Sequence, residues 1–292
     1  MIPNADPSAP PLQSPALSPP AASGVTVHSD VAYLPPDRAE KLDAYLPPAT
    51  FARPLPAVLL IHGGGWRISD KAADRERNIA TTLAAHGYAV FSINYLLNIG
   101  ETNADGRLKL TRLGWPQNLF DCKTALRFIR AASARYSVDP DRIATMGGSA
   151  GGHLSLLLGA TAHHDEFNRH GLYREQRNDV ACILNFYGDY DIRGRKVSPF
   201  EGATPDETAA NETAASPVTH FDASTPPMFI THGTADSIIP VERSRLLARE
   251  LETRGLDYWY VEIAGAPHSY HLEPSQMDLR PSVLAFLKKH LG

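Results

Sequence analysis

Apolar and polar residues follow two different rhythms along this chain, and their alternation defines the expected elements. Short apolar runs are typical of buried strands, whereas longer segments with apolar residues at every third or fourth position are typical of amphipathic helices. Strands are expected near residues 57–61, 89–93, 142–146, 180–186, 228–232 and 258–263. Helices are expected near 72–86, 117–135, 150–161, 241–255 and 276–290. This regular exchange predicts an α/β fold with a mostly parallel, twisted sheet and helices on both of its faces.

The residues before the first of these strands follow another pattern. Hydrophobic and polar residues alternate over 25–28, 31–34 and 42–47, which predicts antiparallel strands at one edge of the sheet. Residues 1–24 are rich in Pro, Ser and Ala and contain neither a charge cluster nor an apolar run, so this tail is expected to be disordered. The chain therefore divides into a tail over 1–24 and one globular domain over 25–292.

Composition narrows the class of protein. With 292 residues, 43% of them hydrophobic and 21% charged, the chain can bury one large core without disulfides or metals. A net charge of −4 gives no electrostatic reason to expect a nucleic acid or an anionic membrane as partner. Cys122 falls in an expected helix and Cys182 in an expected strand, which favours buried thiols over a disulfide.

The sequence contains few signals for targeting or metal binding. No stretch is apolar over the length that a membrane span or a signal peptide requires. The tail would also suit the spacer that remains after an export signal is removed, so a cytoplasmic and an exported location both stay open. His163, His164 and His170 lack the spacing of a zinc motif, and no metal site is expected.

A serine between glycines is the strongest chemical signal. Gly147-Gly148-Ser149-Ala150-Gly151 stands where an expected strand turns into an expected helix, the context of a nucleophile elbow. Glycines at the ends of this run remove Cβ atoms that would collide in so tight a turn. The pattern predicts Ser149 as a nucleophile, and the alternative is a helix start capped by a serine.

A serine nucleophile requires a histidine that accepts its proton and a carboxylate that orients the histidine. In this topology the order along the chain is serine, acid, histidine. Asp236 follows the strand expected near 228–232, and His268 follows the one near 258–263. Loops at the carboxyl ends of parallel strands are where open α/β sheets place their sites, so both side chains are predicted to reach Ser149.

Other residues compete for these roles. Asp189 and Asp191 also follow a strand, one strand earlier, and are expected to cap their own loop. His271 is expected to line the same pocket, but His268 comes first after the strand and is stiffened by Pro267. His153 lies one turn into the helix behind the serine, where packing or a local hydrogen bond is expected.

A glycine run supplies a third element of the site. His62-Gly63-Gly64-Gly65-Trp66 follows the strand expected over 57–61. Backbone N–H groups of such a run, together with the N–H of Ala150 after the nucleophile, would form an oxyanion hole. A phosphate-binding loop is the alternative, but no Gly-Lys-Ser/Thr follows.

The sequences HGGGW, GGSAGG, HGTAD and PHSYH, in that order, resemble the α/β-hydrolase superfamily over residues 25–292. HGGGW and DPDRIATMGGSAGGHLS are more similar to its carbohydrate-esterase branch, with acetyl xylan and feruloyl esterases, than to the hormone-sensitive-lipase branch. Kynurenine formamidases are similar too. The resemblance implies ester hydrolysis through an acyl-enzyme without a cofactor. It implies these roles: Ser149 as nucleophile, Asp236 as acid, His268 as base, and Gly64, Gly65 and Ala150 as oxyanion-hole donors, the glycines being assigned to within one position.

Two stretches interrupt the strand–helix rhythm, 97–116 and 189–225. Loops of this length in a compact domain are usually functional. They are expected to wall an open cleft without the multi-helix lid of a lipase. Trp66 and Trp115 are candidate flat surfaces for a sugar or an aromatic acyl group, with core packing as the alternative.

The expected function is that of a serine carboxylesterase, acting on short-chain (acetyl) or feruloyl esters of plant polysaccharides or oligosaccharides. An amide hydrolase of the same fold, of the kynurenine formamidase or peptidase kind, is one alternative. A non-catalytic binding module built on this fold is another. The oligomeric state is left open.

Overall fold

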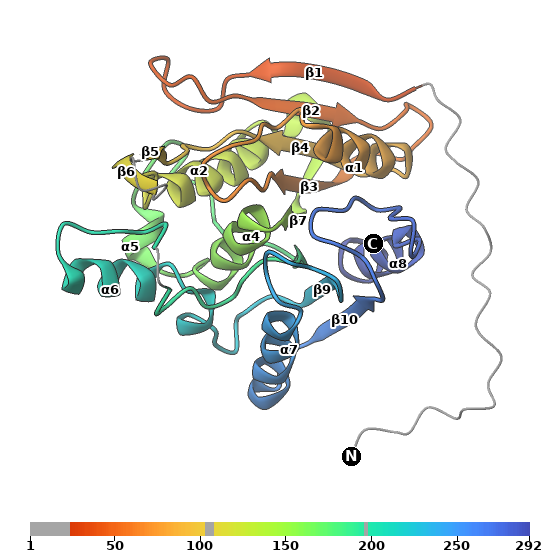
Figure 1. The fold of residues 1–292 in the computed structure, drawn as a ribbon. Coiled ribbons are helices and arrows are strands. Elements are labelled where there is room, and N and C mark those ends of the chain that lie inside the picture. Colours follow the sequence, from red (N-terminus) through yellow and green to blue (C-terminus); the bar gives the residue numbers. More distant parts are fainter. Residues whose placement is uncertain (1–23, 103–107, 196–197) are drawn as a thin grey trace, which may run out of the picture.

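The computed structural model describes residues 24–102, 108–195 and 198–292, and its centre is an eight-stranded sheet (Figure 1). The strands lie in the order β1-β2-β4-β3-β7-β8-β9-β10. Their bounds are β1 (Thr26–Val31), β2 (Leu42–Leu46), β3 (Leu55–Ile61), β4 (Ala89–Ile93), β7 (Val138–Gly148), β8 (Cys182–Phe186), β9 (Met228–Gly233) and β10 (Tyr258–Ile263). β1 pairs antiparallel with β2 and β2 with β4, and all further neighbours are parallel. The predicted mostly parallel sheet with an antiparallel edge is confirmed.

Helices connect these strands and cover both faces of the sheet (Figure 1). They are α1 (Asp74–Ala85), α2 (Gln117–Ala131), α3 (Ser133–Tyr136), α4 (Ala150–Ala160), α5 (Asp165–Asn168), α6 (Pro205–Ala214), the 3₁₀ helix η1 (Pro217–Thr219), α7 (Glu242–Arg254) and α8 (Arg280–Leu291). The expected edge segment over 31–34 is not a separate strand, because β1 ends at Val31. The tail expected over 1–24 lies outside the described residues except for its last residue.

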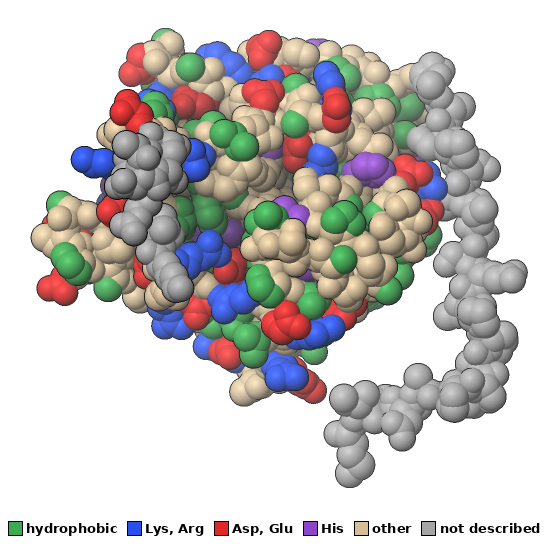
Figure 2. Space-filling view, viewed as in Figure 1, with side chains coloured by type: hydrophobic (Ala, Val, Ile, Leu, Met, Phe, Trp, Pro, Cys, Tyr) green, Lys and Arg blue, Asp and Glu red, His purple; other side chains and the backbone are tan. Residues whose placement is uncertain are grey.

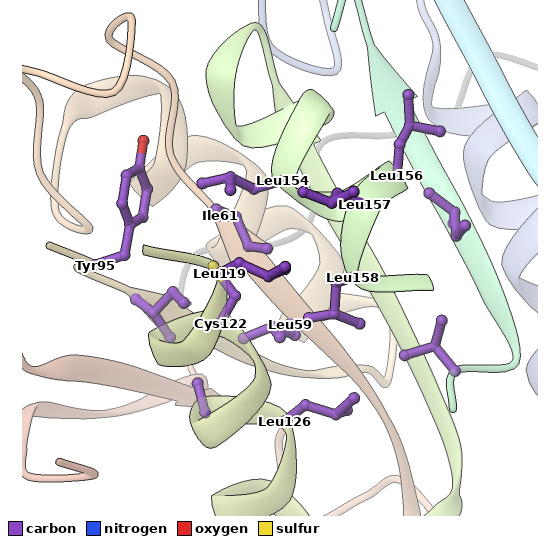
Figure 3. Close-up of a cluster of buried hydrophobic side chains, with 14 of the residues drawn as sticks. Leu59, Ile61, Tyr95, Leu119, Cys122, Leu126, Leu154, Leu156, Leu157 and Leu158 are labelled. Carbon is purple, nitrogen blue, oxygen red and sulfur yellow. The ribbon is translucent and has the colours of Figure 1, made fainter. Parts of the chain in front are cut away.

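Two hydrophobic clusters, one on each face, hold the sheet and helices together. Leu59 and Ile61 of β3 face α2 and α4, and this cluster includes Leu119, Leu126 and Leu154 (Figure 3). The alternate residues of β3, Val58 and Leu60, belong to the second cluster, with α1 and α8. Side chains of a strand point alternately to opposite faces, so one strand supplies both clusters. Each fully buried leucine contributes about 1.5–3 kcal/mol relative to an exposed one.

The two cysteines lie on opposite sides of the sheet. Cys122 belongs to the cluster against α2 and α4, whereas Cys182 belongs to the cluster against α1 and α8. Both thiols are free and buried, as predicted. The sheet between them prevents a disulfide, since such a bond requires Cα atoms within about 7 Å.

The two stretches expected as loops contain regular structure. Residues 97–116 hold a hairpin of β5 (Ile99–Thr102) and β6 (Leu108–Arg112), and 189–225 hold α6 and η1. Residues 103–107 and 196–197 lie outside the described residues. The start of α6 has a readable signal, because Thr204 accepts a hydrogen bond from the N–H of Glu207 and Pro205 occupies the first helical position.

Candidate active site

Ser149 occupies a strained turn between β7 and α4. Its φ of 54° and ψ of −121° lie outside the regions that non-glycine residues favour, and its N–H donates to the carbonyl of Phe186 at 2.9 Å. A Cβ on Gly151 would stand 2.0 Å from the carbonyl oxygen of Ile61, and one on Gly147 would stand 2.3 Å from the Gly151 backbone. The turn therefore requires both glycines, and it presents the serine side chain at the end of the sheet.

The structure brings together the three side chains that the sequence predicted. His268 Nε2 lies 3.0 Å from Ser149 Oγ, and His268 Nδ1 lies 2.6 Å from Asp236 Oδ2. Asp236 follows β9 and His268 follows β10, so both come from loops at the carboxyl ends of parallel strands. The distances are those of a nucleophile bonded to a base and a base bonded to an orienting acid.

Asp236 is held as a fully buried carboxylate. Its Oδ1 accepts the backbone N–H groups of Ile238 at 2.8 Å and Ile239 at 2.9 Å, and its side chain is 0% exposed. Burial alone would raise the pKa of Asp236, but the hydrogen bonds from His268 and from these two N–H groups outweigh it and lower the pKa below its ordinary value. The ionised acid accepts the Nδ1 proton of His268, which leaves Nε2 free to accept a proton from Ser149.

A buried histidine that the sequence reasoning missed, His232, contacts the acid. His232 Nε2 lies 2.8 Å from the Ile239 carbonyl oxygen and 3.1 Å from Asp236 Oδ2, so this nitrogen carries the proton. His232 Nδ1 accepts the hydroxyl of Ser244 at 2.7 Å. Burial lowers the pKa of His232, which keeps the ring neutral. The spacing of His232 four residues before Asp236 within HGTAD was the available signal.

The residues considered as alternatives to Asp236 and His268 make other contacts. Asp189 pairs with Arg243 at 2.7 Å, and Asp191 pairs with Arg193 at 2.8 Å. Neither acid has a recorded contact with His268, in agreement with the expected loop-capping role. His271 Nδ1 accepts the N–H of Glu273, and His271 is not among the described residues that line the pocket at the nucleophile.

The glycine run lies directly against the nucleophile. A Cβ on Gly63 would meet the Gly148 carbonyl oxygen at 2.9 Å and Ser149 Cβ at 3.4 Å. Gly64 and Gly65 have φ values of +93° and +61°, and within the described residues no acceptor is recorded for their N–H groups. Ala150 is the first residue of α4, so its N–H has no partner within the helix. Backbone N–H groups without a recorded acceptor therefore occur at Gly64 and Gly65, which line the same cavity as Ser149, and at Ala150, which follows it; an oxyanion hole requires such donors.

A cavity of about 370 Å³ opens at Ser149. The described residues that line it are Gly63, Gly64, Gly65, Ser69, Ala73, Arg75, Glu76, Gly148, Ser149, Tyr187, Ile238, His268 and Ser269. Three more of its residues, Ser69, Tyr187 and Ser269, have a positive φ, and such strain concentrates at functional sites. None of the described lining residues belongs to 97–116 or 189–225. These segments pack elsewhere, so they do not form the immediate walls that were expected.

Trp66 and Trp115 lie in the core and offer substrate no open ring face. They are 6% and 7% exposed, and both pack edge-to-face on Phe200. Trp66 Nε1 also donates to His153 Nδ1 at 3.3 Å, and His153 Nε2 donates to the Ala215 carbonyl at 2.7 Å. Core packing, the alternative weighed for the tryptophans, is what the structure shows, because Phe200 from the long second stretch covers both rings.

The surface and the rest of the described chain add limits. Acidic and basic side chains are interspersed over the face shown in Figure 2. In the described parts of the chain, no helix is long and apolar enough to cross a membrane. Over the same residues, no group of three or more His, Cys, Asp or Glu side chains could hold a metal ion.

Comparisons of sequence and fold relate this chain to known esterases. The family model BD-FAE matches residues 42–251. The probable carboxylic ester hydrolase LipM of Mycobacterium tuberculosis is 30% identical over 256 residues, which cover 83% of this chain and 56% of LipM. The chain thus spans little more than half the length of that relative.

Two solved structures share the fold. A truncated form of a carbohydrate esterase from gut microbiota superposes with a TM-score of 0.76 at 24% identity, covering 94% of this chain and 99% of that one. The butyrate-bound esterase Est2 of Thermogutta terrifontis superposes with a TM-score of 0.69 at 23% identity, covering 91% of this chain and 92% of its own.

Proposed function

Because the chain belongs to the BD-FAE family of α/β-hydrolase esterases, we propose that it hydrolyses carboxylic esters with Ser149 as the nucleophile. The observation that carries this proposal is the connected set Ser149–His268–Asp236, joined at 3.0 Å and 2.6 Å. A strained serine, a base within reach and an ionised orienting acid together supply nucleophilic catalysis.

The proposed reaction has two symmetrical halves. His268 Nε2 takes the proton of Ser149 as Oγ attacks the ester carbonyl carbon, and the resulting oxyanion lies among the N–H groups of the glycine run and Ala150. His268 then gives the proton to the leaving alcohol, and an acyl group remains on Oγ. Water repeats the attack and releases the acid. Asp236 stays ionised throughout and stabilises the protonated imidazole.

A short acyl group suits the site better than a long one. The cavity of about 370 Å³ is near the lower end of small-molecule pockets, which run from about 300 to 1,000 Å³. Among the described residues that line it, the apolar side chains are few, namely Ala73, Ile238 and the ring of Tyr187. Butyrate bound to the Thermogutta terrifontis esterase supports a short acid, and the gut carbohydrate esterase supports a sugar as the alcohol. We therefore favour acetyl esters of oligosaccharides or polysaccharides over feruloyl esters.

The test uses purified protein and a panel of esters. We expect hydrolysis of p-nitrophenyl acetate and acetylated xylan, with less activity on methyl ferulate and on the amide N-formylkynurenine. Ser149→Ala should lower kcat by a factor of about 10⁴ or more while the protein stays folded. A folded Ser149→Ala protein with the activity of the wild type would contradict the proposal.

Covalent labelling provides a matched control, since three of the described serines line the cavity. A fluorophosphonate should attach to Ser149 alone, because only its hydroxyl contacts the imidazole of His268. Ser69→Ala and Ser269→Ala proteins should therefore still be labelled, and Ser149→Ala should not. Labelling that depends on Ser69 or Ser269 would exclude the assigned nucleophile.

A further inference from the structure

A charged pair from the first turn of α1 lines the same cavity as the nucleophile. Arg75 Nη1 donates to Glu76 Oε1 at 2.7 Å, and Arg75 Nε donates to the carbonyl oxygen of Tyr270 at 2.8 Å. The side chains of Arg75 and Glu76 are 12% and 3% exposed. Burying two charges is costly, and breaking such a pair leaves one of them uncompensated. The proposed reaction steps of Ser149, His268 and Asp236 do not involve this pair.

The pair has unused hydrogen-bonding capacity. Within the described residues, Glu76 Oε2 has no recorded hydrogen-bond partner, and Nη2 of Arg75 is buried without one. This Nη2 lies 2.6 Å from the point where a Cβ of Gly148 would stand, so the guanidinium is next to the residue that precedes the nucleophile. A carboxylate oxygen accepts up to two hydrogen bonds. Glu76 and Ser149 line the same cavity, so the open acceptor belongs to a residue within reach of a ligand bound there.

A hydroxyl group fits this acceptor better than a charged group does. A carboxylate on the ligand would be repelled by Glu76, could not donate to Oε2, and would gain little from Arg75, whose unused Nη2 is buried. An ammonium group would be attracted by Glu76 and repelled by Arg75 to a similar degree, since the pair has no net charge. A neutral hydroxyl donates to Oε2 at no such cost. Acetyl groups carry no hydroxyl, so the donor must come from the alcohol part of the ester.

We propose that Glu76, oriented by Arg75, binds a hydroxyl group of the alcohol part of the substrate next to the scissile bond, which makes an ester of a polyhydroxylated alcohol the preferred substrate. This inference rests on the proposed esterase function and names what selects the alcohol. Glu76 thereby acts as a specificity-determining residue, and Arg75 acts as a positioning residue for its carboxylate.

The test compares two acetyl esters of similar ring size. One is a monoacetylated methyl β-D-xylopyranoside, which has free hydroxyls beside the ester, and the other is cyclohexyl acetate, which has none. The wild type should prefer the xyloside, measured as the ratio of the two kcat/KM values. Glu76→Gln should lower this ratio about 10-fold, since a hydrogen bond to a charged group is replaced by one to a neutral amide.

The matched control removes the same charge from the same helical turn outside the cavity. Asp74 is exposed and pairs with Arg77, so Asp74→Asn should keep the ratio of the wild type. Should Glu76→Gln fail to fold, the wild type alone decides the matter through deoxy analogues of the acetylated xyloside. Loss of one hydroxyl beside the ester should then lower kcat/KM about 10-fold.

The outcomes separate this inference from the proposed function. Turnover of both esters with no preference for the xyloside, or an equal fall of both in Glu76→Gln, overturns the role of Glu76 and leaves the esterase intact. A preference for acetylcholine over neutral esters also overturns it, in favour of a cation subsite. No ester turnover by the wild type, or turnover that survives in Ser149→Ala, refutes the proposed function itself.

Discussion

Replacing the carboxylate of Asp236 by an amide tests the assigned acid at a single atom. In Asp236→Asn the amide oxygen would remain at the Oδ1 position, because the N–H groups of Ile238 and Ile239 donate there at 2.8 Å and 2.9 Å. The amide nitrogen would then face His268 Nδ1 at the present distance of 2.6 Å and would lose the contact with His232 Nε2, whose proton keeps the Ile239 carbonyl oxygen as its acceptor. An amide nitrogen only donates, so Nδ1 must become an acceptor and the imidazole proton moves to Nε2. There it faces Ser149 and cannot accept its proton.

The expected loss follows from this tautomer change. The same substitution in another serine hydrolase lowers kcat by about 10⁴ with its geometry intact. We expect a similar factor here, equivalent to about 5.4 kcal/mol in the activation free energy. Measurement of kcat and KM with p-nitrophenyl acetate should place the loss in kcat, since Asp236 is fully buried and does not line the cavity.

The control for this substitution is Asp191→Asn. Asp191 is 21% exposed at the side chain and pairs with Arg193, so its replacement should change KM or stability and leave kcat within a few-fold. The reasoning is refuted if Asp236→Asn retains more than a tenth of the wild-type kcat, or if Asp191→Asn is the more damaging change. Either result would show that a different carboxylate orients His268.

Further predictions concern the preferred acyl chain length, the contact of His232 with Asp236, the turn at Gly151 and the pH dependence of stability. Across p-nitrophenyl esters kcat/KM should fall gradually to butyryl and steeply by octanoyl, as each methylene is worth about 1–3 kcal/mol in a fitted pocket; a rise toward decanoyl would indicate an apolar tunnel instead. His232→Gln should lower kcat about 10-fold or more with little change in KM, since Asp236 loses a charge-assisted donor; an unchanged kcat in the folded variant would remove His232 from the site. Gly151→Ala should abolish cooperative folding or sharply lower Tm, because its Cβ would stand 2.0 Å from a carbonyl oxygen; a Tm like that of the wild type would contradict the elbow geometry. Burial lowers the pKa of His153 from 6.5 in the unfolded chain to about 4 in the folded protein. The stability that depends on keeping this ring neutral is therefore complete above the unfolded pKa and is lost as the pH falls toward the folded pKa. Urea unfolding at pH 7 and pH 5 should therefore show the wild type losing about 2 kcal/mol more than His153→Gln, and equal losses would show that His153 does not carry this dependence.

Most of the sheet and the three side chains of the candidate triad could be predicted from the sequence. Strand and helix periodicity, the glycines around Ser149 and the positions of Asp236 and His268 after strands are local properties, readable within a few residues. The parallel topology then places strand ends along one edge of the sheet, so residues 119 and 32 positions apart could be expected to meet. The short hairpin of β5 and β6 was missed because its local pattern is too brief to stand out. The helix α6 was missed although Thr204 and Pro205 mark its start, because its residues PDETAANETA have no apolar periodicity.

Only the tertiary structure decided which side chains share the cavity and which are buried beneath it. Trp66 follows the glycine run and was a candidate for substrate contact, with core packing as the alternative, and Phe200, far along the chain, covers it. Glu76 lies within a helix and gave no separate signal, and the one signal for His232, within a strand, was its spacing before Asp236 in HGTAD. Their positions depend on how distant segments pack: Arg75 reaches the backbone at Tyr270, and His232 contacts Ser244 of α7. Secondary structure follows from interactions between near neighbours in the chain, whereas the walls of a cavity are set by contacts between segments that only the complete fold brings together.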